Sequence, residues 1–170
     1  QEQLGEAFDR DGGFAARGEV DEALLARLLD EPYFAAAAPK STGREVFHLD
    51  WLRSQLHDSH IVPENVQATL VALSARSIAD AVRAHAPSAR EVLVCGGGVH
   101  NPVLMQAIAA NLAPRAVVST ATRGIDPDFV EAMAFAWLAR ERLLGHAPEN
   151  VCNVTGARGA RVLGGIYFGA

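Results

Sequence analysis

The stretch from Glu91 to Leu112 constrains the fold more than any other part of the chain. It reads EVLVCGGGVHNPVLMQAIAANL: a short apolar run, three consecutive glycines, an Asn-Pro pair, and then apolar residues at helical spacing. Asn101 is a favourable N-cap, and Pro102 suits the first helical position. The stretch therefore predicts a buried strand that turns directly into a helix.

The three glycines, Gly96, Gly97 and Gly98, leave the backbone of this predicted turn uncovered. Without Cβ atoms, a flat or phosphorylated ligand can approach the main chain closely. Free N–H groups at a helix start favour an anion by roughly 0.3–1 kcal/mol. A tight turn with nothing bound explains the glycines equally well. The chain has neither a GxGxxG motif nor a GxxxxGK[ST] phosphate loop, so the spacing leaves the ligand open.

From Glu91 onward, strand and helix patterns alternate. The predicted elements are strands over residues 91–95 and 116–119 and helices over residues 102–112 and 127–144. Asp126 is the expected cap of the last helix. This βαβα order implies parallel strands with right-handed crossovers, so the fold class is predicted as α/β with a mainly parallel sheet. The tail, residues 153–169, is expected to form a final strand or a turn packed against that sheet.

Helical patterns dominate residues 1–90. The predicted helices cover residues 20–29, 49–56 and 63–85. In the longest of them, Leu70, Leu73, Ile78 and Val82 recur at helical spacing and are expected to face inward. The sequence thus predicts a helical region followed by a smaller region with strands.

Composition limits the classes of function. The chain has 170 residues, of which 49% are hydrophobic, enough for one substantial core. Its formal net charge of −5 includes no basic run, which argues against nucleic acid and anionic lipid as partners. No apolar stretch is long enough for a membrane span. Cys95 and Cys152 are far apart in sequence, which suggests no disulfide framework and predicts a reducing, cytoplasmic location.

Two features predict that further strands come from elsewhere. The first residues, QEQLGEAFDRDG, lack a starting Met. Two or three parallel strands also make a poor sheet, because both faces need cover and both edges need protection. We therefore expect upstream residues to complete the sheet.

Three polar clusters follow predicted strands: residues 96–101, 120–128 and 155–161. Because ligands bind beyond the carboxyl ends of parallel strands, these clusters are expected to converge on one crevice. Asp126 and Asp128 are most simply the cap and first-turn acids of the following helix. Glu131 begins an otherwise apolar helix and could accept hydrogen bonds from a sugar's hydroxyl or amide groups; solvent exposure explains it equally well.

Other reactive side chains give weaker signals. His57 and His60 are too few for a metal site without Cys, Asp or Glu at ligand spacing, so none is predicted. Arg44 and Arg123 could clamp a phosphate or carboxylate, or simply be solvated. Ser41 has no recognisable base partner, and neither has any other serine, so the chain gives no support for nucleophilic catalysis.

Five segments, in order, resemble the carboxyl-terminal half of the anhydro-N-acetylmuramic acid kinases. They are FDRDGGFAARGEVDEALLARLL, PYFAAAAPKSTGREVFHLDWL, VLVCGGGVHNPVLMQAIAANL, GIDPDFVEAMAFAWLA and NVTGARGARVLGGIY. PKSTGRE with LDWL, VEAMAFAWLA and NVTGA are more specific than the glycine cluster, which many kinases of the actin, hexokinase and Hsp70 fold share. The resemblance spans nearly the whole chain.

The resemblance implies an incomplete actin/hexokinase-like (ribonuclease H-like) lobe with a helical insertion. Residues 1–90 would be the helical segment of the second lobe and residues 91–170 its nucleotide-side core, with the amino-terminal lobe absent from this chain. The implied enzyme uses ATP and Mg²⁺ on 1,6-anhydro-N-acetylmuramic acid. Water opens the anhydro bridge at C1 while O6 takes the γ-phosphoryl group, which gives N-acetylmuramic acid 6-phosphate and ADP in peptidoglycan recycling.

The resemblance also implies site residues. Gly96, Gly97 and Gly98, with Asn101 at the helix start, match the adenosine motif. Glu131 matches the family glutamate at the start of the late helix and is the expected sugar contact. The family's catalytic aspartate precedes a Gly-Pro-Gly-Asn turn that this chain lacks, so no catalytic base is assigned here. The segment from Lys40 to Glu45 matches a family signature whose role is either support of the cleft or direct contact.

The implied partners are the amino-terminal half of the same enzyme and the anhydro sugar, and a homodimer is left open. Two alternative functions remain at this stage. The chain could be a nucleotide-binding or partner-binding module without turnover, or part of another sugar kinase of the same fold.

Overall fold

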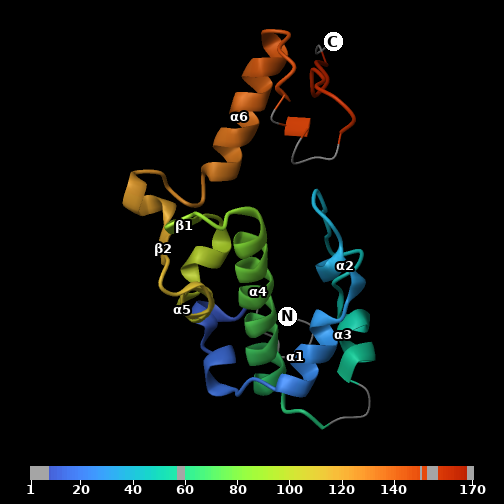
Figure 1. The fold of residues 1–170 in the computed structure, drawn as a ribbon, viewed down its shortest axis with the longest axis vertical. Helices are drawn as coiled ribbons and strands as arrows, with labels where there is room; N and C mark the ends of the chain where they lie inside the picture. The colour runs from blue at the N-terminus through green and yellow to red at the C-terminus, as the bar shows by residue number, and fades with distance from the viewer. Residues whose placement is uncertain (1–7, 57–59, 150, 153–156, 168–170) are drawn as a thin grey trace.

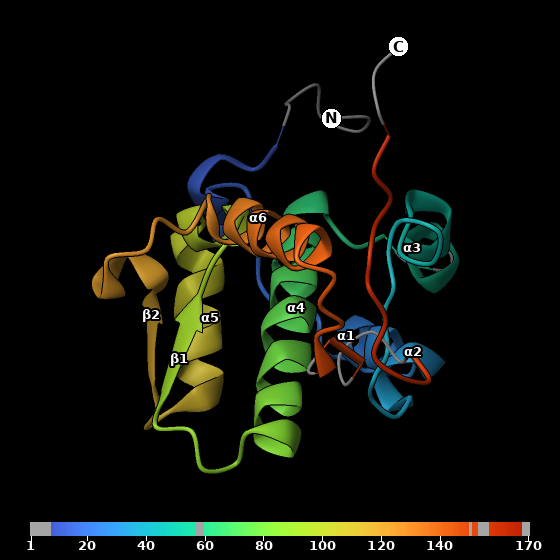
Figure 2. The same ribbon diagram turned by 90° about the horizontal axis from the view of Figure 1, so that it is seen from above.

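The computed structural model describes residues 8–56, 60–149, 151–152 and 157–167. Within them lies one parallel sheet of two strands, with helices packed against one of its faces. Figures 1 and 2 show the sheet beside α4 (Pro63–His85) and α5 (Pro102–Leu112). On the far side of α4 lie α1 (Glu22–Leu29), α2 (Pro32–Ala35) and α3 (Leu49–Leu56), and α6 (Val130–Leu143) lies above the strand ends. This arrangement confirms the predicted α/β class. None of the helices in these ranges combines the length and apolar character needed to cross a bilayer.

The sheet consists of β1 (Glu91–Val94) and β2 (Ala116–Ser119), connected by α5 (Pro102–Leu112). The strands are parallel, with Val92 opposite Val117 and Leu93 opposite Val118. The predicted strand–helix–strand order is confirmed, although β1 ends one residue before the expected Cys95. Because successive side chains in a strand point to opposite faces, Val92 and Val117 reach the core while Leu93 is 45% exposed on the other face.

The first core lies between α4 (Pro63–His85) and α5. Ala75 and Ala79 of α4 are fully buried against Ile108 and Leu112 of α5, and Val92 of the sheet packs on this cluster. The small alanine side chains allow the two helices to approach closely. Ile78 was expected to face inward, and that expectation is wrong: it is 38% exposed, because the alanine face is the one that meets α5.

The second core joins α1 (Glu22–Leu29), α3 (Leu49–Leu56) and the first half of α4. Leu24 and Leu28 are fully buried with Leu73, and Trp51 packs on the cluster. Helix α1 begins after Asp21, whose side chain accepts a hydrogen bond from the Leu24 N–H at 2.8 Å. All three helices predicted in the first half are therefore confirmed.

A short helix that the sequence did not predict, α2 (Pro32–Ala35), follows α1. Its aromatic residues belong to a cluster of edge-to-face and tilted rings formed by Tyr33, Phe34, Phe47 and Trp51. Lys40 closes the loop onto this cluster: its Nζ donates to the carbonyls of Tyr33 and Phe34, at 2.8 Å each, and lies 4.7 Å from the Tyr33 ring centroid. In this structure Lys40 therefore supports the loop.

Helix α6 covers Val130–Leu143, so it begins later than the predicted residue 127. The prediction that Asp126 caps it is wrong. The Asp126 side chain instead accepts the N–H of Asp128 at 3.0 Å within a turn, and α6 starts after Phe129 with no side-chain cap. The turn delays the helix because Asp side chains compete for nearby backbone donors.

The tail was predicted to form a final strand or a turn packed against the sheet, and its described residues, 157–167, do neither. Residues 157–167 form bends without a strand, and Figure 1 places them beside α6, away from the sheet. Residues 153–156 and 168–170 lie outside the described ranges.

Candidate functional site

The glycine turn, residues 96–100, directly follows β1 and contains a 3-10 helix over Gly97–His100. Gly96 has φ 79°, a left-handed conformation that side chains disfavour. The Asn101 side chain accepts a hydrogen bond from the Leu104 N–H at 3.0 Å, which confirms it as the cap of α5. Strand, turn and helix start therefore lie as the sequence predicted.

One of the three glycine N–H groups in the turn is already hydrogen-bonded within the protein. This corrects the expectation that all the N–H groups at this helix start are unpaired. Gly96 N–H donates to the carbonyl of Pro127 at 2.8 Å. Within the described ranges, the N–H groups of Gly97 and Gly98 donate to no protein acceptor. The surface available to a ligand is thus narrowed to Gly97 and Gly98, both of which are exposed.

The space around the turn is open. A Cβ added at Gly96 or Gly97 would meet no described atom within 4 Å, whereas at Gly98 it would touch Leu104 Cδ2 at 3.4 Å. The left-handed backbone explains glycine at position 96. At Gly97 neither backbone conformation nor neighbouring atoms require glycine, so a group from outside the described chain could approach the main chain there without steric hindrance.

The second polar cluster meets the glycine turn, as predicted. The β2–α6 loop, residues 120–129, begins with a 3-10 helix over Thr120–Arg123 and ends in the turn before α6. Together, the loop and the turn enclose an open cavity of about 550 Å³. It is lined by Val99, His100, Ser119, Ala121, Gly124, Ile125, Asp126, Pro127 and Asp128. The third cluster is not part of this lining: Thr155 lies outside the described ranges, and residues 157–161 lie beyond α6 (Figure 1).

Sequence reasoning missed a hydrogen-bonded pair, His100 and Asp128, among the residues that line this cavity. His100 Nε2 lies 2.9 Å and 3.0 Å from the two carboxylate oxygens of Asp128. The acid was interpreted only as a first-turn residue of the following helix, and in the structure it belongs to the turn before α6. The only sequence signal was its place in a polar cluster after a strand, which does not identify a partner.

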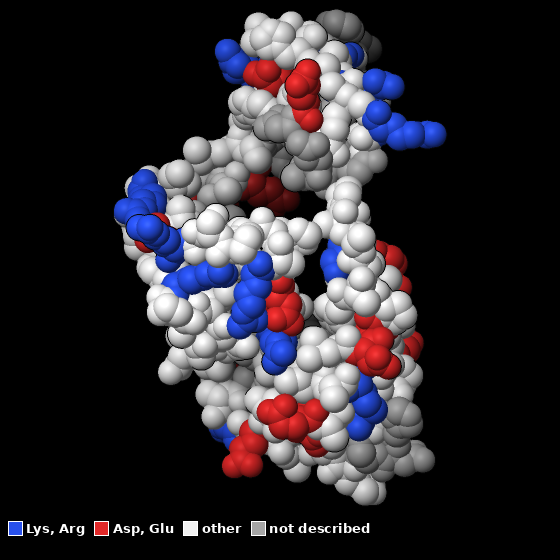
Figure 3. Space-filling model, in the orientation of Figure 1, with Lys and Arg blue, Asp and Glu red and all other residues white. Residues whose placement is uncertain are grey.

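Glu131 lies in the first turn of α6 and is exposed. Because the preceding Pro127 carbonyl binds the glycine turn, this end of α6 lies close to the candidate site. Figure 3 shows that the molecule is hollowed beneath α6. Glu131 is thus exposed at the end of α6 that adjoins the glycine turn.

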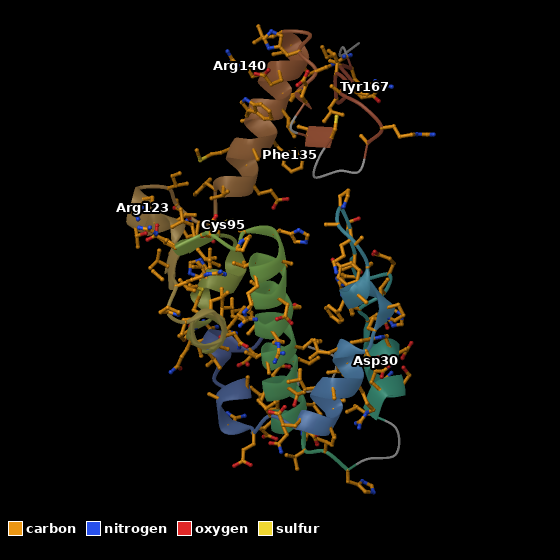
Figure 4. The ribbon with its side chains drawn as sticks, in the orientation of Figure 1. Asp30, Cys95, Arg123, Phe135, Arg140 and Tyr167 are labelled. Carbon is orange, nitrogen blue, oxygen red and sulfur yellow. The ribbon has the colours of Figure 1, made fainter. Side chains whose placement is uncertain are left out.

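The two arginines considered as anion clamps do not join the site. Arg123 Nη2 lies 2.6 Å from Glu91 Oε2, and Figure 4 shows Arg123 at the outer margin of the molecule, on the side away from α4. Arg44 is exposed in the loop after α2. No group of three or more His, Cys, Asp or Glu side chains in the described ranges could hold a metal ion; His57 lies outside those ranges.

What the site offers chemically follows from these contacts. It presents two free backbone donors, space for a flat group against them and an exposed carboxylate at the neighbouring helix start. Such donors suit the oxygen atoms or ring edge of a nucleotide, and a carboxylate suits hydroxyl or amide donors.

Comparison with known proteins identifies relatives along the whole chain. The profile of the family described as anhydro-N-acetylmuramic acid kinase matches residues 1–169. The chain is 55% identical over 172 residues to the anhydro-N-acetylmuramic acid kinase of Burkholderia mallei, covering 98% of this chain and 44% of that relative. With the protein of the same name from Xanthomonas campestris pv. campestris, the identity is 54% over 167 residues, with the same coverage. The chain therefore spans less than half the length of these relatives.

Proposed function

The chain belongs to the anhydro-N-acetylmuramic acid kinase family, and we propose that it supplies the nucleotide side and part of the sugar wall of such an enzyme. The proposed reaction uses ATP and 1,6-anhydro-N-acetylmuramic acid. Water opens the anhydro bridge at C1, and O6 takes the γ-phosphoryl group to give N-acetylmuramic acid 6-phosphate and ADP. This is a step of peptidoglycan recycling.

Gly97 carries the proposal for the nucleotide. Its amide has no acceptor among the described residues, it is exposed, and an added Cβ would meet no described atom. Together with the Gly98 amide, it offers a main-chain surface on which adenosine or a phosphate can lie without steric hindrance. In this proposal Gly96 shapes the turn and Asn101 fixes the start of α5, so both support the contact rather than make it.

Glu131 is the proposed sugar contact. A carboxylate accepts hydrogen bonds from hydroxyl and amide groups, and the anhydro sugar carries both. The catalytic base is proposed to lie in the amino-terminal half, because the motif that carries the family's aspartate is missing from this chain. The role proposed for the present residues is to bind and orient the two substrates.

Mg²⁺ is proposed only as a companion of ATP. The described residues do not fit a resident metal site, since they contain no cluster of three suitable ligands. Mg²⁺ is usually bound through substrate phosphates, waters and one or two carboxylates. No step of the proposed mechanism depends on a metal held by this chain.

The amino-terminal half of the enzyme is the proposed macromolecular partner. In the described sheet, β1 and β2 pair only with each other, so each leaves an open edge. Apolar side chains are also left uncovered: Leu93 is 45% exposed, Met133 55%, and Phe135, labelled in Figure 4, 62%. Residues 132–139 of α6 are all apolar, and a helical stretch that is apolar on all sides is normally buried. The alternative is a homodimer, in which a second copy of this chain covers these surfaces.

A cytoplasmic location is part of the same proposal. Cys95 and Cys152 are both free thiols, which is usual for proteins of a reducing compartment.

The decisive experiment substitutes Gly97 in the complete kinase. We expect Gly97→Val to weaken ATP binding by about tenfold or more, equivalent to ~1.4 kcal/mol, because the new side chain occupies the space needed by the nucleotide. Isothermal titration calorimetry measures the affinity, and a coupled assay measures ADP release with the anhydro sugar. Gly97→Ala should give a smaller loss.

Gly13→Ala is the matched control, because Gly13 is also exposed and has φ −65°, which alanine adopts readily. It should leave ATP binding unchanged. Unaltered ATP affinity in Gly97→Val would remove the turn from the nucleotide site. A wild-type enzyme that binds ATP but phosphorylates no sugar would favour a binding module, and a preference for a reducing sugar would favour another sugar kinase.

A further inference from the structure

We propose that His100 and Asp128 are positioning residues that hold the glycine turn against the β2–α6 loop and so keep the Gly97 and Gly98 amides in place for the nucleotide. This inference rests on the proposed function, because it concerns the same nucleotide site. Neither side chain is assigned a contact with ATP.

The pair connects the two segments that form the site. His100 is the last residue of the 3-10 helix that begins at Gly97, and Asp128 lies in the turn before α6. The His100 Nε2 atom contacts both carboxylate oxygens of Asp128, at 2.9 Å and 3.0 Å. Gly97 and His100 therefore lie within a single short 3-10 helix.

The loop fixes the backbone at Asp128. The Asp128 N–H donates to Asp126 Oδ1 at 3.0 Å, which closes a turn of the type that Asp residues favour. The neighbouring Pro127 carbonyl accepts the Gly96 N–H at 2.8 Å. A backbone bond thus ties the first residue of the glycine turn to the loop, and the His100–Asp128 pair ties its last residue.

The pair has little to contribute to stability. The side chains of His100 and Asp128 are 60% and 52% exposed, and exposed ion pairs contribute little to folding. Local structure does not need it either, since Asn101 caps α5. Its effect is on geometry: without it, the glycine turn keeps only the Gly96–Pro127 bond to the loop among the described residues, and the cavity between them can widen.

The test is a double-mutant cycle in the complete kinase, with His100→Ala, Asp128→Ala and the double variant. Each single variant is expected to raise the Kd and KM for ATP roughly two- to fivefold, the range that an exposed pair can provide. The KM for the sugar, kcat and the unfolding midpoint should stay close to wild type. The double variant should be no worse than either single one, because residues that act as a unit are not additive.

Asp50→Asn is the matched control: it removes another exposed acid, 3.0 Å from Arg53 Nη1, far from the glycine turn, and should change nothing. ATP affinity measured by calorimetry separates the possible failures. A wild-type protein that binds no ATP would overturn the proposed function and this inference together. Normal ATP binding in the single variants, or additive losses in the double variant, would overturn the positioning role alone.

Discussion

Gly96 and Gly97 are neighbours, yet different physical reasons account for glycine at each position. Gly96 has φ 79° and gives its N–H to Pro127, so its role is to shape the turn. Gly97 has no such constraint and lies in open space. The distinction matters because a substitution at Gly96 would change the fold of the turn as well as access to it, whereas Gly97 tests access by itself.

Glu131 gives a second prediction at the scale of a residue. Glu131→Gln should raise the KM for the anhydro sugar or lower kcat by an amount equivalent to about 1–1.5 kcal/mol, the difference between a hydrogen bond to a charged acceptor and one to a neutral group. Steady-state kinetics with varied sugar at saturating ATP would measure the change.

Glu22→Gln provides the comparison for that experiment, since Glu22 is likewise an exposed glutamate in the first turn of a helix, α1. It should behave as wild type. Wild-type kinetics in Glu131→Gln would exclude the carboxylate from the sugar site.

At the scale of the elements, α1 is joined to α4 by a buried hydroxyl. Thr69 is 0% exposed; its Oγ1 accepts the Asp21 N–H at 2.9 Å and donates to the Asn65 carbonyl at 2.7 Å. Asp21 is also the cap of α1. One hydroxyl therefore fixes the position at which α1 begins against α4, which supports the second core.

Thr69→Val should lower the free energy of unfolding of the complete protein by about 1–3 kcal/mol, because the Asp21 N–H loses its buried acceptor. Urea unfolding followed by circular dichroism would measure it. Thr69→Ser keeps the hydroxyl and should lose less. If the Val variant were as stable as wild type, the hydroxyl would have no role in holding α1.

At the scale of the whole molecule, the described chain has a well-packed side and an uncovered one. Helices α4 and α5 bury one face of the sheet through Ala75, Ala79 and Ile108. The opposite face exposes Leu93, and α6 exposes Met133 and Phe135. Apolar side chains on an uncovered sheet face and an apolar helix are typical of a surface that packs against another part of a protein.

The expected consequence concerns catalysis by parts of the enzyme. This chain by itself should release no ADP in the presence of ATP and the anhydro sugar, and co-expression with the amino-terminal half should restore turnover. Sedimentation would show whether the two parts associate. Turnover by the isolated chain, or association without any turnover while the covalently complete enzyme is active, would contradict the proposed division of the site.

Local patterns in the sequence were sufficient for the elements. They predicted β2, α3, α4 and α5 with their observed limits and the Asn101 cap, because these features depend on neighbours within about one helical turn or strand repeat. The glycine turn was also identified, together with the expectation that a second polar cluster meets it. Glu131 as a sugar contact stays a prediction.

Only the tertiary structure decided which hydrogen-bonding groups and apolar side chains find a partner within the described residues and which do not. The bond from Gly96 to Pro127, the His100–Asp128 pair and the exposure of Ile78 each depend on segments that are distant in sequence. The late start of α6 has a local cause instead: the Asp126 side chain accepts the N–H of Asp128, two residues further on, and does not cap the helix. Local propensity determines what a segment can become, whereas long-range packing determines which of its donors, acceptors and apolar faces find a partner.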